Sequence, residues 1–217
     1  TNMIAYLFSI ILLPTFSRML KYKESVEQLV KLSFTLLITV AILVASSCSF
    51  YSKEIMSMLY HDDIEQTAPV FIVLMCCFIA ISTTYIFGTL LTANGNMREL
   101  NAVAAGGMII NIGLNLFLIP RYHAFGSAVT SLATQFLTAF AQVLLVQYNF
   151  RFKVNYRLLT TLFVFVLGVA SINYFSKMLH FTWMVNFSIM LISCLLWAFF
   201  IRLLSIKSMF RILKYGA

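Results

Sequence analysis

The side chains in this chain that could do chemistry are uncharged hydroxyls and amides inside long apolar stretches. One set is spaced by four, four, three and four residues: Ser127, Ser131, Gln135, Thr138 and Gln142. A helix turns once in about 3.6 residues, so this spacing places all five side chains on one helical face. Such a face can hydrogen-bond a polar ligand without carrying any charge of its own.

Two further polar sets follow the same rule. Asn111 and Asn115 are four residues apart, and a hydroxyl stripe consists of Thr35, Thr39, Ser46 and Ser49. Polar side chains within a bilayer are costly unless they meet a partner or water. Hydrogen bonds between helices are one explanation, and we favour it for the hydroxyls. For Asn115, Gln135 and Gln142 we favour a hydrated cavity that faces a substrate, because an amide has more hydrogen-bonding sites than a tight helix seam satisfies.

Seven apolar stretches must position these residues. They cover residues 3–16, 32–51, 68–93, 100–120, 124–147, 158–176 and 183–201. Backbone N–H and C=O groups in hydrocarbon must pair within the chain, so each stretch is predicted to be a helix. The sequence thus predicts an all-α polytopic transmembrane bundle of about seven membrane helices. The first stretch is shorter than the others, so we expect a truncated first helix in a piece of a longer protein.

The net charge of +8 follows the topology of such a bundle. Of the 15 Lys and Arg residues, 12 lie in the segments 17–31, 94–99, 148–157 and 202–217, which alternate with segments of low positive charge. The positive-inside rule places these four segments, and with them the C-terminus, in the cytoplasm. The acidic segment 52–67 is then outside. The basic excess therefore indicates topology and contact with anionic lipids rather than nucleic-acid binding, and segment 17–31 is expected to form a short amphipathic helix at the headgroups.

Motifs typical of soluble enzymes and of metal or cofactor sites are absent from the sequence. There is no Gly-rich phosphate loop followed by Lys and Ser or Thr, and no His-Glu-x-x-His pattern. His61, His123 and His180 are isolated in outer loops, and the four cysteines lie in apolar stretches where they pack as small hydrophobes. We therefore expect no metal, no cofactor and no enzymatic activity.

Turn-forming residues mark two borders between helices. Asn94-Gly95-Asn96 is a tight-turn signal, because Asn and Gly tolerate a positive φ. Pro120 stands where a helix should stop and Gly126 follows shortly after it. Residues 100–147 are therefore predicted to form a helical hairpin with a very tight outer turn.

Three segments carry a resemblance to a known family. They are residues 90–98 (LLTANGNMR), 111–122 (NIGLNLFLIPRY) and 126–130 (GSAVT), joined by Leu13-Pro14 and Ser17-Arg18 at the first helix end. This pattern resembles the C-terminal half of the polysaccharide flippases, the O-antigen and exopolysaccharide exporters. Their superfamily also includes the lipid II flippase and the multidrug and toxin extrusion transporters. The sequence departs from the pattern at His123, where the family commonly has Gly.

The resemblance implies a two-lobed transporter of the bacterial inner membrane, of which residues 1–217 would be the C-terminal lobe and a missing N-terminal lobe the partner. The two lobes would alternately open a central cavity to either side. The implied cargo is an oligosaccharide on a polyprenyl pyrophosphate. Its sugars would contact Asn111, Asn115, Ser131, Gln135 and Gln142, and its pyrophosphate would contact Arg18 and Arg98, since Arg binds phosphate bidentately. Both arginines also fit a purely topological role.

Two other functions stay open at this point. A cation-coupled multidrug antiporter of the same superfamily is expected to carry ionisable residues in its spans, and the apolar stretches here contain no Asp or Glu. A membrane glycan polymerase or ligase would need acid, base or cationic groups at the outer face, where only segment 52–67 offers several carboxylates. The flippase is the favoured reading.

Overall fold

The computed structural model describes residues 2–60, 63–152 and 155–204, and all the regular secondary structure in these segments is helical. His61, Asp62 and most of the C-terminal basic segment 202–217 lie outside the described residues. The helices are α1 (Asn2–Lys21), α2 (Glu27–Phe50), α3 (Ser52–Leu59), α4 (Ile64–Ala93), α5 (Met97–Phe150), α6 (Tyr156–Ser176) and α7 (Trp183–Phe200). The predicted all-α transmembrane bundle is thereby confirmed.

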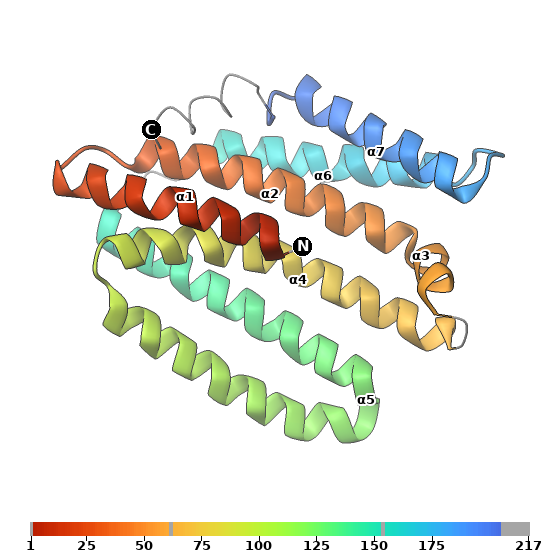
Figure 1. Ribbon diagram of the computed structural model, residues 1–217, viewed down its shortest axis with the longest axis horizontal. Helices are drawn as coiled ribbons and strands as arrows, with labels where there is room; N and C mark the ends of the chain where they lie inside the picture. Colours follow the sequence, from red (N-terminus) through yellow and green to blue (C-terminus); the bar gives the residue numbers. More distant parts are fainter. Residues whose placement is uncertain (1, 61–62, 153–154, 205–217) are drawn as a thin grey trace.

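Five of these helices are long and apolar enough to cross a membrane: α2, α4, α5, α6 and α7. Helix α5 has 54 residues and contains one non-helical residue, His123, where it folds back on itself. Figure 1 shows the two halves side by side as a hairpin, in green and teal. The predicted hairpin over residues 100–147 is therefore confirmed, and α5 supplies two crossings.

Helix α4 lies at the centre of the packing. It contacts α1, α2, α3 and α5, whereas α6 and α7 pack on each other and on α2 (Figure 1). The helices run roughly parallel and antiparallel to one another, and their buried side chains form a continuous apolar cluster that includes Phe16, Leu37, Phe78 and Phe165. Many large apolar side chains on the outer faces, such as Leu116 and Phe117 of α5, remain exposed, as is normal for surfaces that face lipid.

Helices α4 and α1 end in the same backbone motif. At the end of α4, the N–H of Asn96 donates to Leu91 O and the N–H of Gly95 donates to Thr92 O, with Gly95 at φ 82°. This is a Schellman motif, which needs a residue in the left-handed region. The turn predicted at Asn94-Gly95-Asn96 is therefore confirmed.

Helix α1 ends in the same way without a glycine. The N–H of Glu24 donates to Met19 O, the N–H of Lys23 donates to Leu20 O, and Lys23 has φ 57°. The amphipathic helix expected over residues 17–31 is therefore wrong. These residues are divided between the last turn of α1, this turn and the first turns of α2, because the motif stops the helix in the middle of the segment.

The first helix and the acidic segment also differ from expectation. Pro14, expected near a helix end, lies inside α1, which continues to Lys21. Proline is tolerated inside membrane helices, although Pro14 has no N–H to donate to the carbonyl of Ile10. The acidic segment 52–67 contains α3, whose Lys53 pairs with Glu65 of α4 at 3.0 Å.

The turn of the α5 hairpin is set by His123 and Gly126. His123 has φ 49° and ψ −128°, a region in which L residues are rarely found. A Cβ at Gly126 would overlap the Leu118 carbonyl, so only glycine allows the two halves to approach so closely. These contacts bring Asn111 and Thr134, 23 residues apart in sequence, within hydrogen-bonding distance.

Candidate functional site

The two asparagines of α5 join a chain of hydrogen bonds across the hairpin. Asn115 Nδ2 donates to Asn111 Oδ1 at 2.9 Å, and Asn111 Nδ2 donates to Thr134 Oγ1 at 3.2 Å. Thr134 Oγ1 in turn donates to Thr130 O at 2.7 Å. We call these four residues the α5 ladder. Both asparagines thus form hydrogen bonds within the hairpin, as expected for residues that hold two helices together.

The ladder nevertheless keeps one open acceptor. Asn115 Oδ1 is buried and has no hydrogen-bond partner within the described residues. A buried acceptor without a partner costs free energy, about 1–3 kcal/mol. A ligand or water that donates to this oxygen would recover that cost.

Gln142 is buried between α5 and α4. Its side chain packs on Gly88, where an added Cβ would lie only 3.1 Å from Gln142 Oε1. That oxygen is buried and has no partner among the described residues. Gln142 therefore occupies a close helix–helix contact, which does not fit the open, hydrated cavity expected for it.

Ser131 and Gln135 differ from the buried Gln142 at the end of the stripe. Both are half-buried, and neither makes a hydrogen bond in the described part of the chain. Their polar groups are thus among those on α5 that remain available to a ligand, together with Asn115 Oδ1. Their role as substrate contacts stays a prediction.

The hydroxyls of α2 bond to their own helix. Thr35 donates to Lys31 O, Thr39 to Thr35 O and Ser49 to Ala45 O, at 2.6–2.7 Å. Ser46 bonds Ile42 O in the same way. Such back-bonding satisfies a hydroxyl in hydrocarbon without any partner helix. The α2 stripe therefore needs neither a neighbouring helix nor a ligand.

The two candidate arginines lie at the same end of the bundle. Arg18 is in the last turn of α1 and Arg98 is the second residue of α5, and both are exposed. Helix α4 packs against both α1 and α5 and lies between them in Figure 1. Both residues thus lie at the same end of the bundle, on two helices that pack against α4, and a shared pyrophosphate site stays a prediction.

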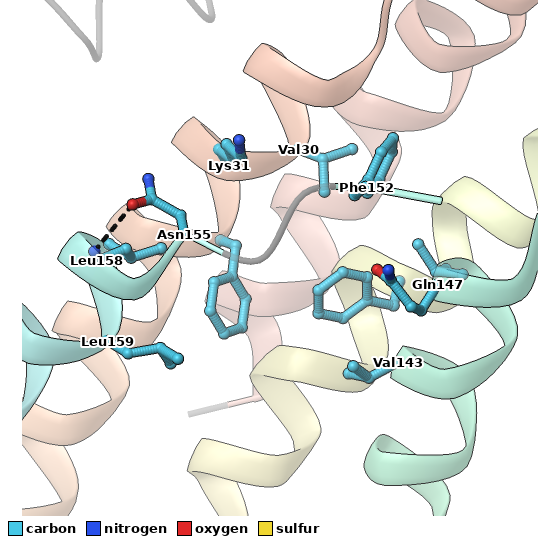
Figure 2. Close-up of a pocket in the computed structure, with 11 residues that line it drawn as sticks. Val30, Lys31, Val143, Gln147, Phe152, Asn155, Leu158 and Leu159 are labelled. Atoms are coloured by element: carbon cyan, nitrogen blue, oxygen red, sulfur yellow. Dashed lines mark hydrogen bonds between the residues drawn. The ribbon is translucent and has the colours of Figure 1, made fainter. Parts of the chain in front are cut away.

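A cavity of about 250 Å³ opens near the same end, between α2, α4, α5 and α6 (Figure 2). Its walls are mainly apolar, and its polar groups come from Lys31, Gln147 and Asn155. None of the seven candidate residues lines it. Sequence reasoning missed this cavity, because its residues come from four separate stretches that have no shared spacing.

Sequence reasoning also missed two members of the α5 ladder. Thr130 and Thr134 are four residues apart and lie next to the predicted stripe on the helix surface. That spacing could have identified them once the hairpin was predicted. Within the described segments, no group of three His, Cys, Asp or Glu side chains could hold a metal ion.

Comparison with known proteins decides the family. The family model described as "Lipid II flippase MurJ" matches residues 1–210, nearly the whole chain. The chain belongs to the MurJ lipid II flippase family. A search of curated proteins gives no match. The MurJ match and the helical bundle together establish a multi-pass membrane protein of a flippase family.

The MurJ match also refines the resemblance seen in the sequence. It supports a flippase of lipid-linked cargo, but it does not support the polysaccharide exporters in particular. The motifs behind that resemblance mark helix ends: residues 90–98 end α4, and residues 111–122 approach the α5 turn. Helix ends describe a shared fold and do not report the cargo.

Proposed function

We propose that this chain forms one lobe of a flippase that moves a polyprenyl-pyrophosphate-linked saccharide across the cytoplasmic membrane by alternating access, with lipid II as the cargo. The observation that carries the proposal is the MurJ family match over residues 1–210. The second lobe would be supplied by an N-terminal part of the same protein. An exporter of O-antigen or exopolysaccharide units would use the same mechanism, but the family match favours lipid II.

The polar groups of α5 fit a cargo of this kind. Ser131 and Gln135 are half-buried and have no internal hydrogen bond, so they can bond a sugar without first breaking a bond in the protein. The Asn115 Oδ1 acceptor is open as well. These groups are neutral, which favours an uncharged saccharide over a coupling cation.

The positions of the acidic residues disfavour a cation-coupled antiporter. The acidic residues of the described helices lie near helix ends, as Glu27 in the first turn of α2 and Glu99 in the first turn of α5 illustrate. A proton or Na⁺ site within a membrane span is expected to use a carboxylate. The apolar stretches of this chain contain none.

The test is depletion of the full-length protein in its native cells. Lipid II should accumulate in the inner leaflet, and newly made peptidoglycan should fall. Lipid-linked intermediates of surface polysaccharides and tolerance to cationic drugs should stay unchanged. Accumulation of a surface-polysaccharide intermediate instead would reassign the cargo, and a rise in drug sensitivity with normal lipid II would reject the flippase.

The arginines offer a sharper variant of the same test. Arg18→Lys keeps the positive charge but loses the planar fork that binds phosphate bidentately. If Arg18 binds pyrophosphate, both Arg18→Lys and Arg18→Ala should raise cytoplasmic lipid II. If Arg18 only sets topology, Arg18→Lys should behave as wild type. The same comparison applies to Arg98.

A further inference from the structure

Helix α6 is packed unevenly along its length. Its buried residues are Phe165, Val169, Asn173 and Ser176, which all lie in its middle and at its Ser176 end. Residues 156–164, the first half of the helix, contain no buried position. The two ends of α6 are therefore held to the bundle with very different strength.

The Ser176 end is held by Tyr51, the residue between α2 and α3. Tyr51 is only 2% exposed, and its hydroxyl lies 2.8 Å from Ser176 Oγ. Ser176 Oγ donates its own proton to Asn173 O at 2.7 Å, so the Tyr51 O–H is the donor between the two. The Tyr51 ring meets Phe187 of α7 edge-on, with centroids 5.4 Å apart. We call these contacts the Tyr51 anchor.

An ion pair reinforces the Tyr51 anchor. Lys177 Nζ lies 3.8 Å from Glu54 Oε1 and 5.5 Å from the centre of the Tyr51 ring. A hydrogen bond, an aromatic contact and an ion pair thus all hold the Ser176 end of α6 in place. Moving this end of α6 away from α2 would break all of them together.

The Tyr156 end is packed more loosely: Leu158 and Leu162 are only partly buried against the core, and Leu158 also borders the cavity of about 250 Å³. Figure 2 shows Leu158 and Leu159 of α6 on one side of the cavity and Val143 and Gln147 of α5 on the other. Leu159 is 53% exposed. Side chains that border empty space forgo contacts on that side, so displacing them costs little.

A glycine separates the two halves of α6. Gly168 lies directly before the buried Val169, and a Cβ at this position would overlap the indole of Trp197 on α7. Glycine weakens the continuity of a helix, and bends in helices often occur where it stands. The contact with Trp197 fixes this point of α6 while leaving the backbone locally adaptable.

We propose that the first half of α6 is a gate that pivots at Gly168 and widens or closes the cavity beside it, while the Tyr51 anchor holds the second half to α2. The inference rests on the packing of α6 and not on the nature of the cargo. It therefore stands or falls separately from the proposed function.

The gate is tested by distance measurements between spin labels on the full-length protein in lipid nanodiscs. All native cysteines are replaced first. The gate pair is Val143→Cys with Leu159→Cys, which face each other across the cavity. The control pair is Met58→Cys with Tyr174→Cys, two exposed positions near the Tyr51 anchor but outside it.

The gate pair should give a broad or two-peaked distance distribution, and the control pair a single narrow one. Tyr51→Phe should broaden the distribution of the control pair. Two equally narrow distributions would overturn the proposal, and so would two equally broad ones. Amide hydrogen exchange gives a readout without labels: residues 156–164 should exchange faster than residues 169–176, and equal rates would overturn the gate.

Discussion

Gln135 and Gln142 lie seven residues apart on one face of α5 and meet different surroundings. Gln135 is half-buried without an internal hydrogen bond, whereas Gln142 packs on Gly88. We expect Gln135→Leu to lower transport about fivefold, the equivalent of roughly 1 kcal/mol for one hydrogen bond to cargo. Transport is measured as lipid II flipping in cells, and the amount of folded protein should stay constant.

Gln142→Leu is the matched control for this prediction. It removes a buried oxygen that has no partner, so stability should stay the same or rise, and transport should be unaffected. Normal transport by Gln135→Leu would remove Gln135 from the site. Loss of transport in folded Gln142→Leu protein would show that the Gly88 contact opens to the cargo.

His123 holds a strained backbone at the tip of the α5 hairpin. A non-glycine residue in such a conformation costs about 1–3 kcal/mol of folding free energy. Glycine would remove this strain, but it also loses more backbone entropy on folding, which offsets part of the gain in stability. His123→Gly should therefore raise the stability by about 1 kcal/mol, seen as a higher apparent Tm of the purified full-length protein. His180→Gly, at an exposed turn without a positive φ, should lower the Tm slightly. A lower Tm for His123→Gly would mean that the imidazole makes a stabilising contact.

At the scale of elements, the sequence predicted the transmembrane helices well and their ends less well. Apolar stretches long enough to cross a bilayer leave a helix as the only backbone solution, so α2, α4, α6 and α7 follow directly from hydropathy. Gly95 predicted the turn after α4, because glycine favours a positive φ. Lys23 adopts a positive φ in the same kind of turn after α1, but lysine does not predict a turn. Helix ends set by a non-glycine residue in the left-handed region cannot be predicted from composition.

The candidate site was harder to predict for a related reason. Periodicity identified which face of α5 is polar, but not whether that face meets a helix or a ligand. Gln142 and Gln135 share the face, and Gly88 on another helix decides between them. Such a contact depends on the register of α4 against α5, which no local pattern encodes.

Gly126 determines the closeness of the two halves of α5. Gly126→Ala would drive a methyl group into the Leu118 carbonyl, and overpacking of this kind costs about 1–3 kcal/mol. The bond between Asn111 and Thr134 should weaken with it, and the apparent Tm should fall. Gly113→Ala is the control, since an added Cβ there meets nothing within 4 Å. Equal effects of both substitutions would indicate a more open hairpin.

The Tyr51 anchor joins α2 to the α6–α7 pair. Tyr51→Phe removes a buried hydrogen bond to Ser176 and should cost about 1 kcal/mol of stability. Ser176→Ala removes the same bond, so the double variant should lose less than the sum of the two single losses. Tyr60→Phe, at an exposed position, should have no effect. Strictly additive losses would argue against the Tyr51–Ser176 bond.

The whole molecule is organised by charge at its two ends. Arg18, Arg98, Arg151 and Arg157 belong to one end of the bundle, at the end of α1, at both ends of α5 and at the start of α6. The opposite end carries α3, where Lys53 pairs with Glu65 and Glu54 pairs with Lys177. From the positive-inside rule we expect the arginine-bearing end to lie in the cytoplasm. The cavity beside α6 would then open on the cytoplasmic side.

This orientation predicts which residues an impermeant thiol reagent can reach in intact cells. Tyr22, in the turn between α1 and α2, is 67% exposed, and Met58 of α3 is 66% exposed. In a full-length protein without its native cysteines, Met58→Cys should be labelled and Tyr22→Cys should react only after the cells are opened. Both variants should be labelled in opened cells, which controls for accessibility. Labelling of Tyr22→Cys but not Met58→Cys in intact cells would invert the topology, and with it the placement of Arg18, Arg98 and the α6 gate on the cytoplasmic side.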